Sequence, residues 1–160
     1  MDHIHPAPVV DRQALRALRE RTREQGRSIV LCNGAFDLLH VGHLRYLREA
    51  AKHGDILVAA VNSDKSVRAS KGRNRPVVPQ AERAELLAAL RCVDVIHIFD
   101  ETDVVEVIRT LQPDVHAKGT DYTEDSVPER AVVEAFGGRV VITGDPKNHS
   151  TTDTISRLQR

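Results

Sequence analysis

The sequence of 160 residues contains no tryptophan, only three phenylalanines and two tyrosines, and no excess of charge of either sign. So few aromatic side chains do not form a stacking platform for single-stranded nucleic acid. The 23 Lys and Arg residues balance the 23 Asp and Glu residues, which argues against a domain that coats nucleic acid or an anionic membrane through bulk positive charge. We therefore expect neither nucleic acid nor membrane among the partners.

Long hydrophobic runs and cysteines are also scarce. The longest apolar run, Ile56–Val61, has six residues, far fewer than the ~20 that a membrane-spanning helix needs. The first residues lack the basic segment followed by an apolar segment that marks a secretory signal. Cys32 and Cys92 both stand in apolar surroundings, which predicts two buried free thiols in a reducing compartment. Together these features predict a cytoplasmic protein.

The length suits one domain with a single sizeable core. No Pro/Gly/Ser linker, repeat or low-complexity tract divides the chain, so we predict a single domain over residues 11–160 after a flexible tail over residues 1–10. Five short, mostly apolar runs are predicted strands: Ile29–Cys32, Ile56–Val61, Val95–Phe99, Val115–Ala117 and Arg139–Thr143. Their alternation with helical patterns predicts an α/β fold: a Rossmann-like, doubly wound parallel sheet of five strands with helices on both faces.

The predicted helices lie between these strands and are bounded by capping Asp, first-turn Pro and terminating Gly residues. They span residues 11–25, His43–His53, Pro79–Leu90, Asp103–Leu111, Pro128–Phe136 and a last segment that begins near Thr151. Leu86, Leu87 and Leu90 are expected to point inward, and Ile155 and Leu158 form the apolar stripe of the last helix. In doubly wound sheets, ligands bind beyond the carboxyl ends of the strands, which is where a site is expected.

The first strand leads into a helix at the corner where nucleotide phosphates bind in such folds. Neither G-x-G-x-x-G nor G-x-x-x-x-G-K-[ST] occurs there; instead His40 and His43 bracket Gly42 at the helix start. Gly42 permits close approach of a ligand to the backbone, the free N–H groups favour an anion, and both imidazoles can donate hydrogen bonds to phosphate oxygens. Two other interpretations stay open: zinc binding with Cys32 as a third ligand, and ordinary polar residues at a helix start.

The whole segment Asn33-Gly34-Ala35-Phe36-Asp37-Leu38-Leu39-His40-Val41-Gly42-His43 resembles the signature of the HxGH nucleotidyltransferases, in the form found in their cytidylyltransferase-like branch. The resemblance implies that His40 and His43 are catalytic. It also implies nucleotide or phosphate binding by the other motif positions: Asn33, Gly34, Ala35, Phe36, Asp37 and Gly42. Because Asp37 would stand beside an anionic ligand, we expect it to brace the loop through backbone N–H groups and not to contact phosphate.

The segment Lys65–Arg75 carries five cations and no acidic residue. Such a segment can be a solvated basic loop, or it can attract and hold a polyanion beside the site. Lys71-Gly72 resembles the family's flexible-loop lysine, which implies a catalytic role for Lys71 at the substrate phosphates. Arg83 resembles an arginine of the following helix that binds phosphoryl groups; otherwise it is a surface residue.

The fourth predicted strand leads into Lys118-Gly119-Thr120-Asp121-Tyr122. This segment resembles the K-G-G-D-Y of the heptose-phosphate adenylyltransferases, with Thr120 in place of the second glycine, whereas glycerol-phosphate cytidylyltransferases tend toward M-G-D-D-W. The position and the resemblance favour ribose or base recognition by Lys118, Gly119 and Asp121. A plain turn is the alternative.

Ser150-Thr151-Thr152 stands at the start of the last predicted helix and resembles the S-T-T that binds nucleotide phosphates in both of these subfamilies. The hydroxyls of Ser150, Thr151 and Thr152 can bind phosphate, or they can cap the helix. The residues before them depart from the family pattern, which leaves open whether Lys147 or His149 adds a phosphate contact.

The resemblance extends over about residues 28–158 and implies transfer of AMP from ATP to D-glycero-D-manno-heptose 1-phosphate, giving ADP-heptose and pyrophosphate. It implies Mg²⁺ that enters with the nucleotide, a phosphorylated sugar or polyol as the second substrate, and a homodimer. Two alternatives stay open. One is glycerol-3-phosphate cytidylyltransferase or a related CTP-dependent enzyme, and the other is a non-catalytic nucleotide-binding module that kept the fold.

Overall fold

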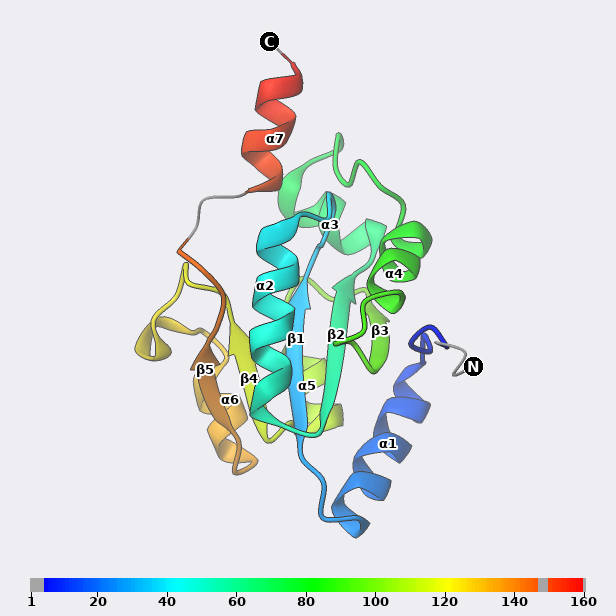
Figure 1. Ribbon diagram of the computed structural model, residues 1–160, viewed down its shortest axis with the longest axis vertical. Coiled ribbons are helices and arrows are strands. Elements are labelled where there is room, and N and C mark those ends of the chain that lie inside the picture. The colour runs from blue at the N-terminus through cyan, green and yellow to red at the C-terminus, as the bar shows by residue number, and fades with distance from the viewer. Residues whose placement is uncertain (1–4, 147–149, 160) are drawn as a thin grey trace.

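The computed structural model describes residues 5–146 and 150–159. A parallel five-stranded sheet with the order β3-β2-β1-β4-β5 runs through its centre (Figure 1). The strands are β1 (Ile29–Gly34), β2 (Ile56–Asn62), β3 (Val95–Phe99), β4 (Val115–Lys118) and β5 (Arg139–Ile142). The strand order reverses between β1 and β4, which confirms the doubly wound fold and places its ligand-binding crevice beyond the carboxyl ends of these two strands.

The helices are α1 (Arg12–Glu24), α2 (Val41–Ala50), α3 (Asp64–Lys71), α4 (Gln80–Ala88), α5 (Val105–Leu111), α6 (Arg130–Ala135) and α7 (Thr151–Leu158), with short 3₁₀ turns η1 (Ala51–His53) and η2 (Glu124–Ser126). The helix after β1 begins two residues before the predicted start, so that His40 is its N-cap. Helix α3 was not predicted. The hydroxyl of Ser63 accepts from the Ser66 N–H at the start of α3, and Ser66 and Val67 are buried, so the basic segment is ordered by its cap and its packing.

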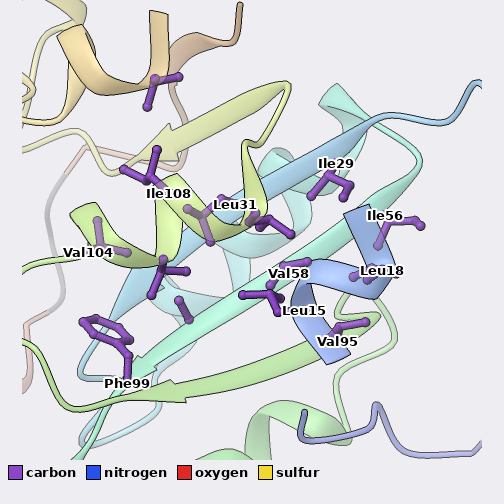
Figure 2. Packing of buried hydrophobic residues seen from close by; sticks show 14 of the residues in the cluster. Leu15, Leu18, Ile29, Leu31, Ile56, Val58, Val95, Phe99, Val104 and Ile108 are labelled. Atoms are coloured by element: carbon purple, nitrogen blue, oxygen red, sulfur yellow. The ribbon is translucent and has the colours of Figure 1, made fainter. Parts of the chain in front are cut away.

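Successive side chains of each strand point to opposite faces of the sheet, and both faces are covered. Ile29 and Leu31 pack with α1, α5 and α6, as Figure 2 shows for the first two of these helices. Val30 and Cys32 pack on the other face, with α2 and α4. Coverage on both sides explains why the strands read as unbroken apolar runs and not as alternating patterns.

Three local features differ from the sequence-based expectation. Residues 7–10, expected in a flexible tail, run along the outer edge of β3, where Ile96 N–H donates to the Pro8 carbonyl at 2.9 Å and Val10 N–H to the Ile96 carbonyl at 2.8 Å. Leu86 is half-exposed while Leu87 is buried. Helix α7 extends beyond the carboxyl edge of the sheet (Figure 1), and Leu158 is 79% exposed, so the predicted apolar stripe is not packed against the core.

Cys32 and Cys92 are both free thiols, the first fully buried and the second partly buried. Burial raises the pKa of Cys32 to about 12, which keeps it a neutral thiol that behaves as a small apolar core residue. No helix within residues 5–146 and 150–159 has the length and apolar character needed to cross a bilayer.

Candidate active site

A cavity of about 310 Å³ lies beside the N-terminus of α2, at the carboxyl edge of the sheet. We call it the histidine cavity. Its walls come from the start of α2 with its N-cap, the end of α3, the segment after β4, residues 143–146 after β5, and residues 150–152 at the start of α7. The lining residues are His40, Gly42, His43, Tyr46, Lys71, Gly119, Thr120, Asp121, Thr143, Gly144, Asp145, Pro146, Ser150, Thr151 and Thr152. The fold therefore brings residues from four separate sequence motifs to one place.

The rings of the two histidines lie against each other in this cavity. Their rings stack with centroids 3.8 Å apart and 21° between the planes, and the edge of Phe36 meets His43 at 5.3 Å. The backbone N–H of His40 donates to Nδ1 of His43 at 3.4 Å, so Nδ1 carries a lone pair and the neutral ring carries its proton on Nε2. Burial, with the charges of His40 and Lys71, lowers the pKa of His43 to about 4. At neutral pH His43 is thus an uncharged Nε2–H donor.

Helix α2 is joined to the segment after β5 and to strand β4 by contacts that no motif predicted. Gly144 has φ +97°, and a Cβ on it would lie 3.3 Å from the Cα of Tyr46, so a side chain there would be strained and crowded. The Gly144 N–H donates to Oε2 of Glu49 at 2.6 Å, and the Tyr46 hydroxyl donates to the Ala117 carbonyl at 2.7 Å. The sequence signal for this contact was a glycine directly after a predicted strand.

The hydroxyl residues at the start of α7 have structural contacts as well as positions in the cavity. Ser150 Oγ accepts from the Asp153 N–H at 3.0 Å, and Thr151 Oγ1 donates to the Leu38 carbonyl at 3.3 Å. Ser150 is thus the helix cap, and Thr151 ties α7 to the loop before α2. Lys147 and His149, considered above as phosphate contacts, lie outside the described residues.

Asp37 braces the loop and is only 2% exposed. Its carboxylate accepts from the N–H groups of Val77 and Val78, both at 2.9 Å, and from Nε of Arg75 at 2.7 Å. Burial alone would raise the pKa of Asp37, but these backbone hydrogen bonds and the Arg75 guanidinium lower it below its ordinary value. Asp37 therefore joins the β1–α2 loop to the α3–α4 loop, and it does not line the histidine cavity.

Arg83 requires a correction, because neither a phosphate contact nor a surface position describes it. Its side chain is fully buried and lies beneath the site. Its guanidinium donates to the carbonyls of Ala35, Asn62 and Val78 and pairs with Asp64. Arg83 thus binds four acceptors in three segments of the protein's own chain, and it does not line the histidine cavity.

A second cavity of about 240 Å³ lies at the carboxyl ends of β1 to β4. We call it the Glu129 cavity. Its lining residues are Asn33, Ala35, Asn62, Val67, Ser70, Lys71, Phe99, Thr102, Asp103, Val104, Lys118, Tyr122 and Glu129, and Lys71 is the lining residue that it shares with the histidine cavity. Asn33, Ala35 and Lys118, expected at the nucleotide, line this second cavity instead. These residues lie at or directly after the carboxyl ends of β1 and β4, whereas the residues that line the histidine cavity lie further along the segments that follow.

Lys118 and Asn33 are both held by partners. Lys118 Nζ lies 3.5 Å from Oε2 of Glu129 and 4.7 Å from the centre of the Tyr122 ring. Asn33 Oδ1 accepts from Nε2 of His116 at 3.0 Å. Burial, together with Lys118, lowers the pKa of His116 to about 3, so this histidine is a neutral buried donor. Its role was not foreseen, because a single histidine within a strand has no recognisable motif.

Gly34 and Phe36 line neither cavity and shape the turn after β1. Phe36 has φ +48°, and a Cβ on Gly34 would lie 3.3 Å from its ring. The zinc interpretation also lacks support, because no group of three or more His, Cys, Asp or Glu side chains within the described residues is placed to hold a metal ion. Its proposed third ligand, Cys32, is buried in the core between the sheet and α2.

Comparison with known proteins adds independent findings. The family profile described as cytidylyltransferase-like matches residues 31–157. The bifunctional protein HldE of Geotalea uraniireducens is 46% identical over 160 residues, which cover 98% of this chain and 33% of that protein. The corresponding protein of Syntrophotalea carbinolica is 46% identical over 92% of this chain and 30% of its own length. The chain thus spans about a third of these relatives.

Two solved structures are also similar. A lipopolysaccharide core biosynthesis protein from Thermoplasma volcanium superposes with a TM-score of 0.66 and 29% identity, over 76% of this chain and all of that one. A pantoate-beta-alanine ligase from Francisella tularensis, solved with a nucleotide and beta-alanine, superposes with a TM-score of 0.65 over 96% of this chain and 77% of its own length. At 16% identity the second likeness concerns the fold alone.

Proposed function

Because the chain belongs to the cytidylyltransferase-like family, we propose that it is a nucleotidyltransferase that transfers AMP from ATP to a sugar 1-phosphate, D-glycero-D-manno-heptose 1-phosphate, and releases pyrophosphate. The observation that carries the proposal is the histidine cavity. It combines His40 and His43 at a helix N-terminus with Lys71 and the hydroxyl residues 150–152. This is a set of hydrogen-bond donors and positive charge suited to a triphosphate.

In the proposed reaction, a phosphate oxygen of the sugar phosphate attacks the α-phosphorus of ATP. The bond from that phosphorus to the oxygen bridging to the β-phosphate breaks, and pyrophosphate leaves with the electron pair. The attacking phosphate is already anionic, so no general base is needed. The protein aligns the two substrates and stabilises charge on the transferring group.

The proposal gives each of these residues a role that its position in the cavity supports. His43 donates from Nε2 to a phosphate oxygen without carrying a charge of its own, since its Nδ1 accepts from the His40 backbone. Lys71, at the end of α3, supplies positive charge to the transition state. Ser150, Thr151 and Thr152, at the start of α7, bind the β- and γ-phosphates through hydroxyl and backbone N–H groups.

The nucleotide substrate is Mg·ATP. In this proposal the ion enters with the nucleotide and is coordinated mainly by the phosphates and water, as Mg²⁺ commonly is. We propose ATP and not CTP as the nucleotide because residues 118–122 resemble K-G-G-D-Y. A sugar phosphate also agrees with the similar Thermoplasma volcanium protein, which is described as acting in lipopolysaccharide core biosynthesis.

The experiment is pyrophosphate release by the purified protein with ATP or CTP, combined with heptose 1-phosphate or glycerol 3-phosphate. We expect turnover with ATP and heptose 1-phosphate, and at least tenfold lower kcat/KM in the other three combinations. Preferred use of CTP would contradict the assignment of the base. Absence of pyrophosphate release in all four combinations would contradict the enzymatic function.

Two further properties belong to the proposal. The free thiols and the nucleotide substrate fit the reducing cytoplasm. A homodimer is expected from the family resemblance, and light scattering during size-exclusion chromatography tests it. Twice the mass of one chain would support the dimer, and the mass of a single chain would contradict it.

A further inference from the structure

The Glu129 cavity has a chemistry different from that of the histidine cavity. Two carboxylates, Glu129 and Asp103, and two amides, Asn33 and Asn62, line it beside Lys118. These carboxylates balance Lys118 and Lys71, so the charged side chains that line the cavity have no net charge. A neutral, hydroxylated molecule is suited to them, because each hydroxyl both donates and accepts a hydrogen bond.

Several of these groups are held so that particular atoms remain for a ligand. Asn33 Oδ1 accepts from His116, which leaves the Asn33 amide NH₂ as a donor. Asn62 Nδ2 donates to Ser66 Oγ at 3.0 Å, which leaves Asn62 Oδ1 as an acceptor. Fixed partners of this kind hold the amides in one orientation, so the cavity presents donors and acceptors at set positions before any ligand arrives.

Glu129 contributes a carboxylate oxygen that needs a hydrogen-bond donor. The residue is 9% exposed, and its Oε2 lies 3.5 Å from Lys118 Nζ. This oxygen is buried and receives no hydrogen bond within residues 5–146 and 150–159. A buried carboxylate oxygen without a hydrogen bond is costly, and a hydroxyl that donates to it would remove that cost.

The position of the cavity connects it to the reaction. Lys71 lines both cavities, so a ligand with its body in the Glu129 cavity and a phosphate at its end directs that phosphate toward Lys71. A nucleotide bound in the histidine cavity would have its phosphates near the same lysine, since Lys71 lines that cavity too. The two substrates of a transfer reaction must meet in this way, with nucleophile and phosphorus in line.

We propose that the Glu129 cavity binds the hydroxylated carbon chain of the acceptor, and that Glu129 is a specificity-determining residue that accepts a hydrogen bond from an acceptor hydroxyl. The inference rests on the nucleotidyl transfer proposed above and assigns the acceptor to residues outside the HxGH motif. The apolar side chains of Phe99, Val104 and Val67 provide a surface for the C–H groups of the acceptor.

The test compares Glu129→Gln with the wild type. This change keeps the size of the side chain and removes the charge. We expect the KM for heptose 1-phosphate to rise about 10- to 100-fold, the effect of losing one hydrogen bond to a charged group. The affinity for ATP, measured by calorimetry, should change less than twofold. The preference for heptose 1-phosphate over glycerol 3-phosphate, as a ratio of kcat/KM, should fall, since the shorter acceptor has fewer hydroxyls to bind.

Two variants complete the design. Glu134→Gln is the matched control, because Glu134 is on helix α6, whose N-cap is Glu129, and its exposed carboxylate pairs with Arg130. It should leave all constants unchanged. Asp103→Asn is a second test of the Glu129 cavity, which can be used if Glu129→Gln does not fold. The asparagine oxygen can still accept from the Val105 N–H, as Asp103 does at 3.0 Å, and the acceptor KM should rise about three- to tenfold.

The outcomes separate this inference from the function on which it rests. If the wild-type protein releases pyrophosphate but neither variant raises the acceptor KM, the assignment of the Glu129 cavity is wrong while the enzymatic function stands. Weakened binding of ATP by Glu129→Gln, in place of weakened acceptor binding, would also overturn it. If the wild-type protein releases no pyrophosphate, both the function and this inference fall.

Discussion

The most informative substitution is Arg83→Lys, because the family resemblance and the structure assign this residue different roles. The buried guanidinium donates to the carbonyls of Asn62 at 2.8 Å and Val78 at 2.9 Å. It also donates to the Ala35 carbonyl and to Oδ1 of Asp64. A lysine carries its three donors on one nitrogen and does not reproduce the planar fork. Lysine at this position therefore leaves at least one of the four acceptors without a donor.

The expected size of the effect follows from those lost contacts. Each buried acceptor left without a hydrogen bond costs about 1–3 kcal/mol, while lysine keeps the positive charge opposite Asp64. We expect Arg83→Lys to lower the free energy of unfolding by about 3 kcal/mol. For a domain of this length that corresponds to a fall in Tm of roughly 6–12 °C.

Urea unfolding and thermal melts measure this loss, and kinetics distinguish the two roles. Arg91→Lys, an exposed arginine shortly after α4, serves as the control and should change stability by less than about 0.5 kcal/mol. Below the Tm of Arg83→Lys, the KM for ATP should stay within about threefold of wild type, because Arg83 does not line the histidine cavity. Unchanged stability together with a KM for ATP raised more than tenfold would refute the structural role and restore the phosphate contact.

Three other predictions concern the site and its support. His43→Ala should lower kcat by about 10²–10³ with little change in stability. The control His53→Ala, on the η1 turn that follows α2, should leave kcat unchanged. Near wild-type turnover by a folded His43→Ala protein would contradict the donor role. Asp37→Asn should lower the free energy of unfolding in urea by about 3 kcal/mol, since Arg75 loses its buried carboxylate partner, and equal stability would contradict this. The free energy of unfolding should be highest above about pH 6.5 and should fall as the pH falls toward 4, because the unfolded chain protonates His43 and His116 in this window while the folded protein does not. His116→Gln should reduce the difference between the free energies of unfolding that urea titrations give at pH 7 and pH 5. An unchanged difference would contradict this prediction.

The sheet could be predicted because its determinants are local. Ile56–Val61 and Val95–Phe99 are apolar runs with recognisable stops, and covered parallel strands require that composition. Helix α3 could not be predicted on the same terms. Its sequence from Asp64 to Lys71 is dominated by charged and small residues, and its order depends on packing. Ser66, for example, donates to the carbonyl of Glu101 at 2.6 Å, and that partner belongs to another part of the chain.

Within a single motif of the candidate site, the roles of some residues could be predicted from the sequence and the roles of others could not. His40, Gly42 and His43 could be placed at a phosphate site, because a glycine and two donors at a helix N-terminus already have that chemistry. The neighbouring Asp37 has its partners at Arg75, Val77 and Val78, and Arg83 meets Ala35, which is 48 positions away in the sequence. Such partners depend on how loops meet above the sheet, which no local pattern records. A motif position can thus act at the ligand or beneath it, and only the buried or exposed state of its side chain distinguishes the two.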